Sequence, residues 1–203
     1  MSERMIRKAG AFEILNHWAL ALSFFVLALS GAGFLYHLEG VAALFGGPQG
    51  MRGIHNWAGV VFAVSLAGTV FNYLGVSLSF SYDDIDWLMK GGGYLSRKKI
   101  NVPPQDKINT GQKLYYLGVL FAGGLISASG LAIWLLPGNR ELVLASHFVH
   151  TLCYAALLFF IPIHIYLATL ANPGTVRIMI SGTVPLDWAR KRHAKWVKKM
   201  GYE

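Results

Sequence analysis

Five of the seven histidines lie within or at the rim of long apolar stretches: His17, His55, His147, His150 and His164. An ionisable side chain at membrane depth is costly and is usually retained for a function. Neutral imidazole nitrogens are good ligands for iron and other transition metals. For any one of these histidines, the alternative is an ordinary hydrogen bond between helices. Their joint placement therefore has to decide between the two roles.

Two of these histidines share one face of the last apolar stretch. His150 and His164 are 14 residues apart, which in a helix is about 21 Å along the axis and about 40° around it. His147 is about 260° from His164 and lies off this face. His17 opens the first stretch at the inner side, and His55 opens the second at the outer side. We therefore expect His55 to meet His150 near the outer face. His17 is expected to meet His164 near the inner face.

Two imidazoles that reach one depth from two helices suit the two axial positions of a haem iron. A metal without a porphyrin would normally recruit carboxylates or thiolates as well. The apolar stretches contain no Asp or Glu and only one cysteine, Cys153, so the chain alone cannot build a disulfide or a cysteine-ligated iron–sulfur cluster. The pattern predicts two b-type haems for electron transfer. A transporter or a haem-free anchor is the alternative, and it would lack the b-type absorption bands.

Four stretches without Asp, Glu, Lys or Arg carry these histidines: residues 14–38, 53–82, 114–139 and 142–176. Each exceeds the roughly 20 residues that a helix needs to cross a bilayer core. The expected fold is an all-α integral membrane protein, a four-helix transmembrane bundle that binds two haems. Residues 1–175 are predicted to form this domain and residues 176–203 a basic cytoplasmic tail. The predicted helices span residues 15–36, 53–78, 110–136 and 142–170.

The net charge of +8 is distributed as a topology signal, which argues against nucleic acid as a partner. The N-terminus, the middle loop and the tail hold 16 of the 18 Lys and Arg residues, and the other two loops hold only Arg52 and Arg140. Positive loops stay in the cytoplasm, so both termini are predicted there, in a bacterial inner membrane. The tail is expected to be an amphipathic helix, solvated or facing lipid headgroups, and the alternative is a specific docking element. His37 and His193 are expected to be solvated.

The chain resembles the cytochrome b, or gamma, subunit of membrane-bound respiratory formate dehydrogenase. The resemblance covers nearly the whole chain and rests on short motifs. They are Asn16-His17-Trp18, Ala28-Leu29-Ser30-Gly31, Ile54-His55 with Gly59, Asp84-Ile85-Asp86-Trp87-Leu88, Asn109-Thr110-Gly111-Gln112-Lys113, Ser129-Gly130-Leu131-Ala132-Ile133-Trp134, His150 and His164 at their 14-residue interval, and Trp188-Ala189-Arg190-Lys191-Arg192-His193.

The resemblance implies axial haem ligands at the four paired histidines and a quinone site beside the inner haem. Asn109, Gly111 and Gln112 match residues that line this site. The two amides would supply hydrogen-bond donors, and the glycine would let a ring approach the backbone. The alternative for these residues is an N-terminal helix cap. Pro162, two residues before His164, departs from the family pattern and would remove one helix hydrogen bond.

The resemblance also implies partners: an iron–sulfur subunit that feeds electrons to the outer haem and a molybdopterin catalytic subunit beyond it. Electrons would pass inward to menaquinone or ubiquinone, and the chain by itself would oxidise no substrate. The same haem helices could instead serve a nickel–iron hydrogenase or a thiosulfate reductase. Membrane lipid surrounds such a protein, and an oligomer is compatible with the sequence.

Overall fold

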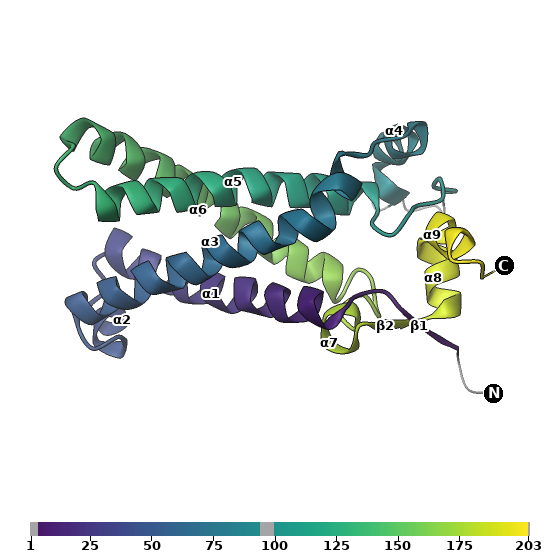
Figure 1. Ribbon diagram of the computed structural model, residues 1–203, viewed down its shortest axis with the longest axis horizontal. Helices are drawn as coiled ribbons and strands as arrows, with labels where there is room; N and C mark the ends of the chain where they lie inside the picture. The colour runs from purple at the N-terminus through teal and green to yellow at the C-terminus, as the bar shows by residue number, and fades with distance from the viewer. Residues whose placement is uncertain (1–3, 94–99, 203) are drawn as a thin grey trace. The chain divides into compact units, whose positions relative to one another are not determined.

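Four long helices dominate the computed structural model, which describes residues 4–93 and 100–202 (Figure 1). All four are long and apolar enough to cross a membrane. Their bounds are α1 (Ala11–Leu35), α3 (Pro48–Leu78), α5 (Thr110–Leu135) and α6 (Arg140–Ala168). The predicted spans are therefore confirmed. The first two helices begin four to five residues earlier than expected because they extend through Glu13 and Arg52, charged residues that lie outside the apolar spans.

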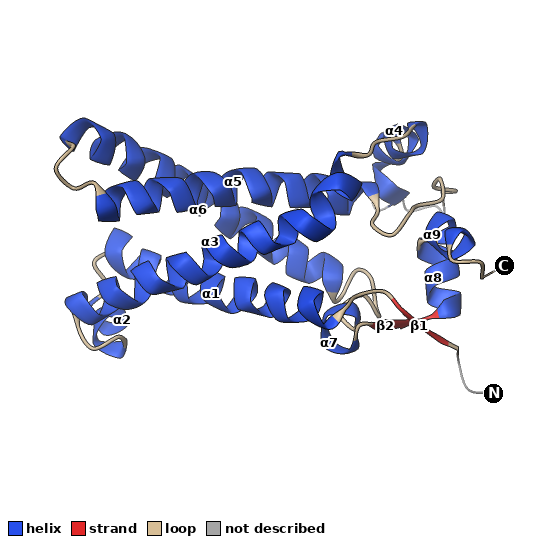
Figure 2. Cartoon of the chain, viewed as in Figure 1, coloured by secondary structure: helices blue, strands red, loops and turns tan. Residues whose placement is uncertain are grey.

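Short elements connect and flank the long helices (Figure 2). They are the strands β1 (Met5–Arg7) and β2 (Thr183–Pro185), the helices α2 (Glu39–Leu44), α4 (Tyr82–Met89), α7 (Ile178–Ser181), α8 (Leu186–Arg192) and α9 (Ala194–Lys199), and the 3-10 helix η1 (Gly91–Gly93). Arg97, Lys98 and Lys99, which belong to the basic middle loop, lie outside the described residues.

The chain forms two compact units. The first, here called the helical unit, comprises Leu15–Thr69 and Val119–Ile165. Its core is a cluster of Phe24, Phe62, Leu66, Ala122 and Leu157, contributed by all four long helices. Small residues allow the close packing, since a methyl group on Gly123 would lie 2.8 Å from the Leu66 side chain. Many large apolar side chains are exposed, as expected for surfaces that face lipid.

The second, here called the terminal unit, comprises Met1–Ile14, Val70–Gly118 and Tyr166–Glu203. In it β1 pairs antiparallel with β2, with Ile6 opposite Val184. Ile6 packs in a core with residues of α7, β2, α8 and α9, among them Trp196, which is 7% exposed. Gly182, with φ of 72°, joins the tail to the N-terminal segment. Its carbonyl oxygen accepts a hydrogen bond from the Lys8 backbone N–H at 2.7 Å. A Cβ at Gly182 would lie 2.6 Å from the Ala9 carbonyl oxygen.

The expectation of a solvated or lipid-facing tail helix is wrong. Trp196 is buried in the core of the terminal unit, and His193, expected to be solvated, is only 3% exposed. His193 Nδ1 lies 2.6 Å from the backbone carbonyl oxygen of Asp106. Burial, and then the nearby charge of Lys8, lower the pKa of His193 to about 3. Ile6 of the N-terminal strand packs against the apolar residues of the tail in this core.

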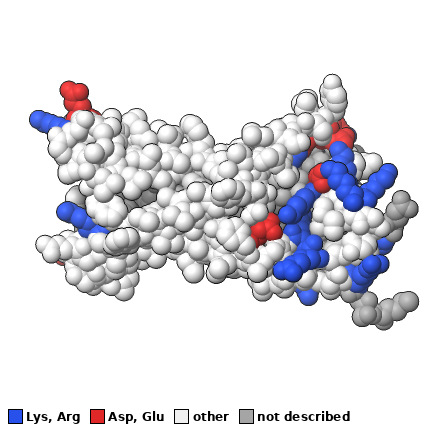
Figure 3. Space-filling view, in the orientation of Figure 1, with Lys and Arg blue, Asp and Glu red and all other residues white. Residues whose placement is uncertain are grey.

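The basic side chains of α8 and α9, unlike Lys8 and Lys113, remain at the surface of this unit. Figure 3 shows Lys and Arg gathered where α8 and α9 lie, while the middle of the long helices is free of charge on the face shown. Several of these cations pair with acids of the middle loop, as Lys195 does with Asp83 and Lys199 with Asp106. The tail is thus bound to the loop by ion pairs, and to the N-terminal segment by the apolar core.

Candidate functional site

The outer histidine pair joins α3 and α6 within the helical unit. The ring centroids of His55 and His150 are 6.2 Å apart, and the ring planes are inclined by 54°. Each Nδ1 atom faces a serine hydroxyl. Ser30 Oγ lies 2.7 Å from the Nδ1 atom of His55, and Ser129 Oγ lies 3.1 Å from that of His150. The structure thus brings together the two residues that the sequence predicted to meet.

The inner pair joins α1 and α6 in the same unit. The ring centroids of His17 and His164 are 6.3 Å apart, with the planes inclined by 46°. The Nδ1 atom of His17 is buried and has no hydrogen-bond partner among the described residues. The side chain of Trp18 meets the His17 ring edge-on at 5.5 Å. The predicted inner pair is therefore also assembled, but its surroundings differ from those of the outer pair.

Both pairs fit a ligand held between two imidazoles. Metal–imidazole bonds of about 2.0–2.1 Å on each side, together with the radii of two rings, give a centroid separation of about 6 Å. Each pair can offer a metal ion only two nitrogen ligands, one from each ring. Within residues 4–93 and 100–202, no group of three or more His, Cys, Asp or Glu side chains is placed to hold a metal ion. The remaining donors would have to come with the metal, as they do in haem. The residues therefore fit a haem at each pair.

The segment predicted to line a quinone site forms the cap of α5. The backbone N–H of Asn109 donates to Gln112 Oε1 at 2.9 Å, and the backbone N–H of Gln112 donates to Asn109 Oδ1 at 2.8 Å. This reciprocal pair is a capping box. The indole of Trp87 lies over Gly111, where an added Cβ would be 2.9 Å from Trp87 Cη2. The capping bonds use only the side-chain oxygens, so the NH2 groups of Asn109 and Gln112 take no part in them.

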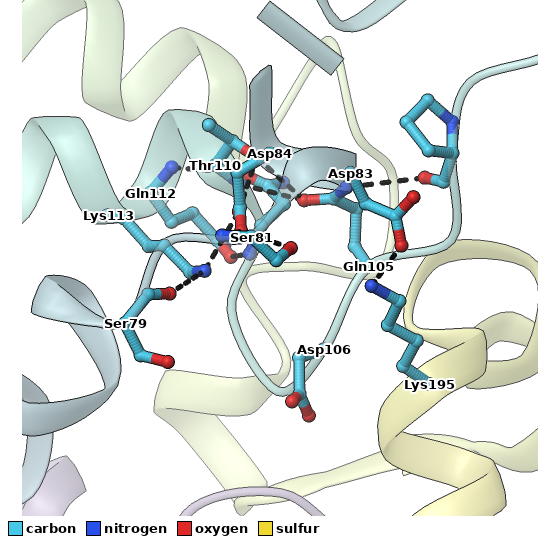
Figure 4. Close-up of polar contacts among 12 residues, drawn as sticks. Ser79, Ser81, Asp83, Asp84, Gln105, Asp106, Thr110, Gln112, Lys113 and Lys195 are labelled. Carbon is cyan, nitrogen blue, oxygen red and sulfur yellow. Dashed lines mark hydrogen bonds and ion pairs between the residues drawn. The ribbon is translucent and has the colours of Figure 1, made fainter. Parts of the chain in front are cut away.

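A buried polar network joins α4 to the first turn of α5 beside this cap (Figure 4). Lys113 Nζ donates to Asp84 Oδ1 at 2.8 Å and to the Ser79 carbonyl oxygen at 2.7 Å. Thr110 Oγ1 also donates to Asp84 Oδ1, at 2.8 Å. Burial alone would raise the pKa of Asp84, but hydrogen bonds from Lys113, Thr110 and Ser81 lower it to about 2. The carboxylate is thus charged and fully paired, which holds α4 against the start of α5.

Comparison with known proteins identifies the family. Residues 8–182 match the family described as prokaryotic cytochrome b561. The chain belongs to this family. Membership implies b-type haem, and with the four apolar helices it makes the chain an integral membrane protein. The predicted cytochrome b character is therefore confirmed.

Three relatives from this cytochrome b group carry closely related names. The cytochrome b556(fdo) subunit of formate dehydrogenase from Escherichia coli K12 is 30% identical over 193 residues, covering 93% of this chain and 90% of the relative. The cytochrome b556(Fdn) subunit of its nitrate-inducible formate dehydrogenase is 27% identical, covering 97% and 92%. The formate dehydrogenase cytochrome b556 subunit of Haemophilus influenzae is 24% identical, covering 97% and 83%. The resemblance drawn from short motifs is confirmed over most of the chain.

Sequence reasoning did not find the serines beside the outer pair of this cytochrome b. Ser30 and Ser129 are isolated hydroxyls in apolar helices, and such residues commonly bond only to their own helix backbone. Ser23 and Ser127 bond to the backbone of their own helices in this way, and nothing in the local sequence distinguishes Ser30 and Ser129 from them. His147 is exposed on α6 and belongs to neither pair.

Proposed function

We propose that this chain is a dihaem cytochrome b subunit that carries electrons across the bilayer to a quinone. The observation that carries the proposal is the presence of two histidine pairs with nearly equal ring separations, 6.2 Å and 6.3 Å. His150 and His164 of α6 belong to different pairs and are about 21 Å apart along the helix. This spacing supports two redox centres at different depths rather than one.

The chain's own residues would hold and insulate these centres. His55 and His150 would hold one haem, and His17 and His164 the other. When bound, haem iron alternates between two oxidation states and so carries one electron at a time. If two imidazoles held each iron, it would have no free position for oxygen or substrate. The helices around the pairs are apolar and the four histidines are partly buried, which supports electron transfer as the role of the chain.

Partners follow from the relatives. Three of them are named as cytochrome subunits of formate dehydrogenases, which supports an iron–sulfur subunit as electron donor and a molybdopterin subunit as the catalytic partner. The electron donor would feed the outer haem, and the quinone would be reduced at the cytoplasmic side. The bacterial inner membrane is the proposed location, with both termini in the cytoplasm.

The quinone site is proposed at Asn109, Gly111 and Gln112. The NH2 groups of the two amides remain outside the capping bonds and can donate to a quinone carbonyl. The Asp84–Lys113 ion pair beneath the cap fixes the segment without using these donors. A helix cap and a quinone site are therefore compatible uses of the same residues.

Haem counting tests the dihaem proposal. A pyridine haemochrome assay on the purified wild-type complex, normalised to this chain, should give two b haems. His55→Ala should remove the outer haem and His17→Ala the inner one, because each change deletes an axial bond. His147→Ala is the matched control and should keep both, since this exposed histidine belongs to neither pair. A wild-type chain with a single haem would contradict the proposal.

Gln112→Glu separates the quinone role from the cap. Glutamate keeps the side-chain oxygen that accepts a hydrogen bond from the Asn109 backbone N–H, but it lacks the NH2 donor. We expect haem reoxidation by a soluble quinone analogue to slow by about two- to tenfold, the value of one hydrogen bond, while haem reduction by the donor is unchanged. Gln112→Ala should slow reoxidation as well and also weaken the cap.

If haem reoxidation in Gln112→Glu ran at the wild-type rate and Gln112→Ala were less stable, Gln112 would act only as a helix cap and not in the quinone site. Slowing of haem reduction alone would mean that the entry and exit sides of the electron path are reversed.

A further inference from the structure

Each serine hydroxyl beside the outer pair has a carbonyl of its own helix as an acceptor. Ser30 Oγ donates to the Val26 carbonyl at 2.7 Å, and Ser129 Oγ donates to the Leu125 carbonyl at 2.7 Å. A hydroxyl has one hydrogen and two lone pairs. When each serine gives its hydrogen to its own helix, only lone pairs face the Nδ1 atoms of His55 and His150, at 2.7 Å and 3.1 Å.

This arrangement selects one tautomer of each histidine. An Nδ1 atom without a proton would place its own lone pair against that of the serine, which is repulsive. An Nδ1–H group would instead donate a hydrogen bond. Ser30 is fully buried and Ser129 is 7% exposed, so water is poorly placed to compete. With the serine hydrogens on the helix carbonyls, the proton belongs on Nδ1, and Nε2 is left with the lone pair that binds a metal. For His150 the Ile126 backbone carbonyl is a second acceptor that favours the same tautomer.

We propose that Ser30 and Ser129 are positioning residues of the outer site, which fix His55 and His150 in the tautomer that presents Nε2 to haem iron and increase the electron donation of this pair. The proposal rests on the dihaem function. An imidazole that donates its second N–H to an acceptor is a more basic ligand. A more basic ligand stabilises ferric iron and lowers the reduction potential of the site.

The inner pair lacks the corresponding bond at His17. Its buried Nδ1 atom has no hydrogen-bond partner in the part of the chain that the structure describes. The two sites therefore differ in how their ligands are supported, although their ring separations are nearly the same. Removal of a serine hydroxyl should accordingly affect one haem and leave the other unchanged.

The simpler alternative is that these serines only bond to their own helices. The chain provides matched controls for this alternative. Ser127 of α5 donates to the Gly123 carbonyl at 2.7 Å, and Ser23 of α1 donates to the Ala19 carbonyl at 2.7 Å. These bonds are the same as those of Ser129 and Ser30 but have no histidine beside them. Ser127→Ala and Ser23→Ala therefore report the cost of losing a helix bond alone.

The test is a redox titration of the purified complex, followed by the reduced b-type absorption band and by the ferric low-spin electron paramagnetic resonance signals. Ser129→Ala and Ser30→Ala should each shift one of two midpoint potentials upward and alter one ferric signal, with the haem content unchanged. Ser127→Ala and Ser23→Ala should leave both potentials at the wild-type values. Ser129→Thr should restore the wild-type potential because it keeps the hydroxyl.

The His17→Ala background identifies the affected haem, since only the outer haem remains in it. The same shift seen there supports the proposal. Unchanged potentials in Ser129→Ala, or equal shifts in Ser127→Ala, would overturn it. If Ser30→Ala does not assemble, Ser129→Ala and its control decide alone. A wild-type complex with one haem would overturn the dihaem function, whereas two haems with potentials insensitive to both serines would overturn only the serine role.

Discussion

A single glycine makes room for one histidine of the outer pair. A Cβ at Gly130 of α5 would lie 3.0 Å from Cε1 of His150, closer than the ring can accept without moving. Gly130→Val adds three carbons at this point, and overpacking of this kind forces side chains away from their positions. We expect the haem content measured by pyridine haemochrome to fall from two towards about one per chain.

Gly124→Val is the control, because a Cβ at Gly124 of the same helix meets nothing within 4 Å. Equal haem loss in both variants would show that the bulk of valine in α5, and not contact with His150, is responsible.

The four paired histidines could be predicted because their spacing follows helix geometry. His150 and His164 share a face by arithmetic alone, and the direction of each apolar stretch sets the depth of His17 and His55. The serine contacts could not be predicted, since whether Ser30 reaches His55 depends on how α1 and α3 rotate against each other. His193 was assigned wrongly because its partners, the Asp106 carbonyl and the core around Trp196, are distant in sequence.

At the scale of elements, the long helices are predictable and the terminal unit is not. The helices predicted from the charge-free runs match α1, α3, α5 and α6 to within five residues at each end. The strands β1 and β2 have three residues each and pair across almost the entire chain. Segments this short carry no usable periodicity. The basic composition of the tail, which indicates a membrane-surface helix, conceals the apolar residues that pack against β1.

The terminal unit contains a lysine whose burial should make its stability depend on pH. The Lys8 ammonium lies 5.4 Å and 5.3 Å from the ring centroids of Trp188 and Trp196 and has no hydrogen-bond partner among the described residues. Burial, and then the charge of Lys107, lower the pKa of Lys8 from 10.5 to about 6. Between these values the unfolded chain binds a proton that the folded chain does not. Stability should therefore rise with pH across this window, and the full penalty applies below about pH 6.

Lys8→Met should remove this slope, because methionine fills a similar space without a charge. The measurement is amide hydrogen exchange of Ile6 and Val184, corrected for the intrinsic rate, at pH 7 and pH 9. His193, with its pKa lowered to about 3, does not contribute in this range. Wild-type protection should increase with pH, whereas the variant should be equally protected at both. Lower protection of Lys8→Met at pH 7 would mean that attraction of the ammonium to the two indoles outweighs its burial.

At the scale of the whole molecule, the terminal unit ties together three segments that are far apart in the chain. The N-terminal strand pairs with β2 of the tail, and the tail binds the middle loop through Asp83 and Asp106. These contacts require all three segments to lie on one side of the membrane. The four candidate spans among residues 4–93 and 100–202, an even number, give the same result for the two termini. The contacts and the number of spans both place the two termini on the same side of the membrane. Neither says whether that side is the cytoplasm.

The distribution of charge selects the side, and a reporter fusion can test the choice. Of the 18 Lys and Arg residues, 16 belong to these three segments and two to the remaining loops, and such segments are retained in the cytoplasm. Green fluorescent protein fused to the C-terminus should therefore fluoresce, and alkaline phosphatase fused there should be inactive. Alkaline phosphatase inserted in the loop at Gly46–Gly50 should be active, because it would reach the periplasm. The opposite pattern at both sites would invert the membrane orientation and place the proposed quinone site on the outer face. Activity of the phosphatase at both sites would instead contradict the β1–β2 pairing and the four-span count together, because the termini and the middle loop could then no longer share a side.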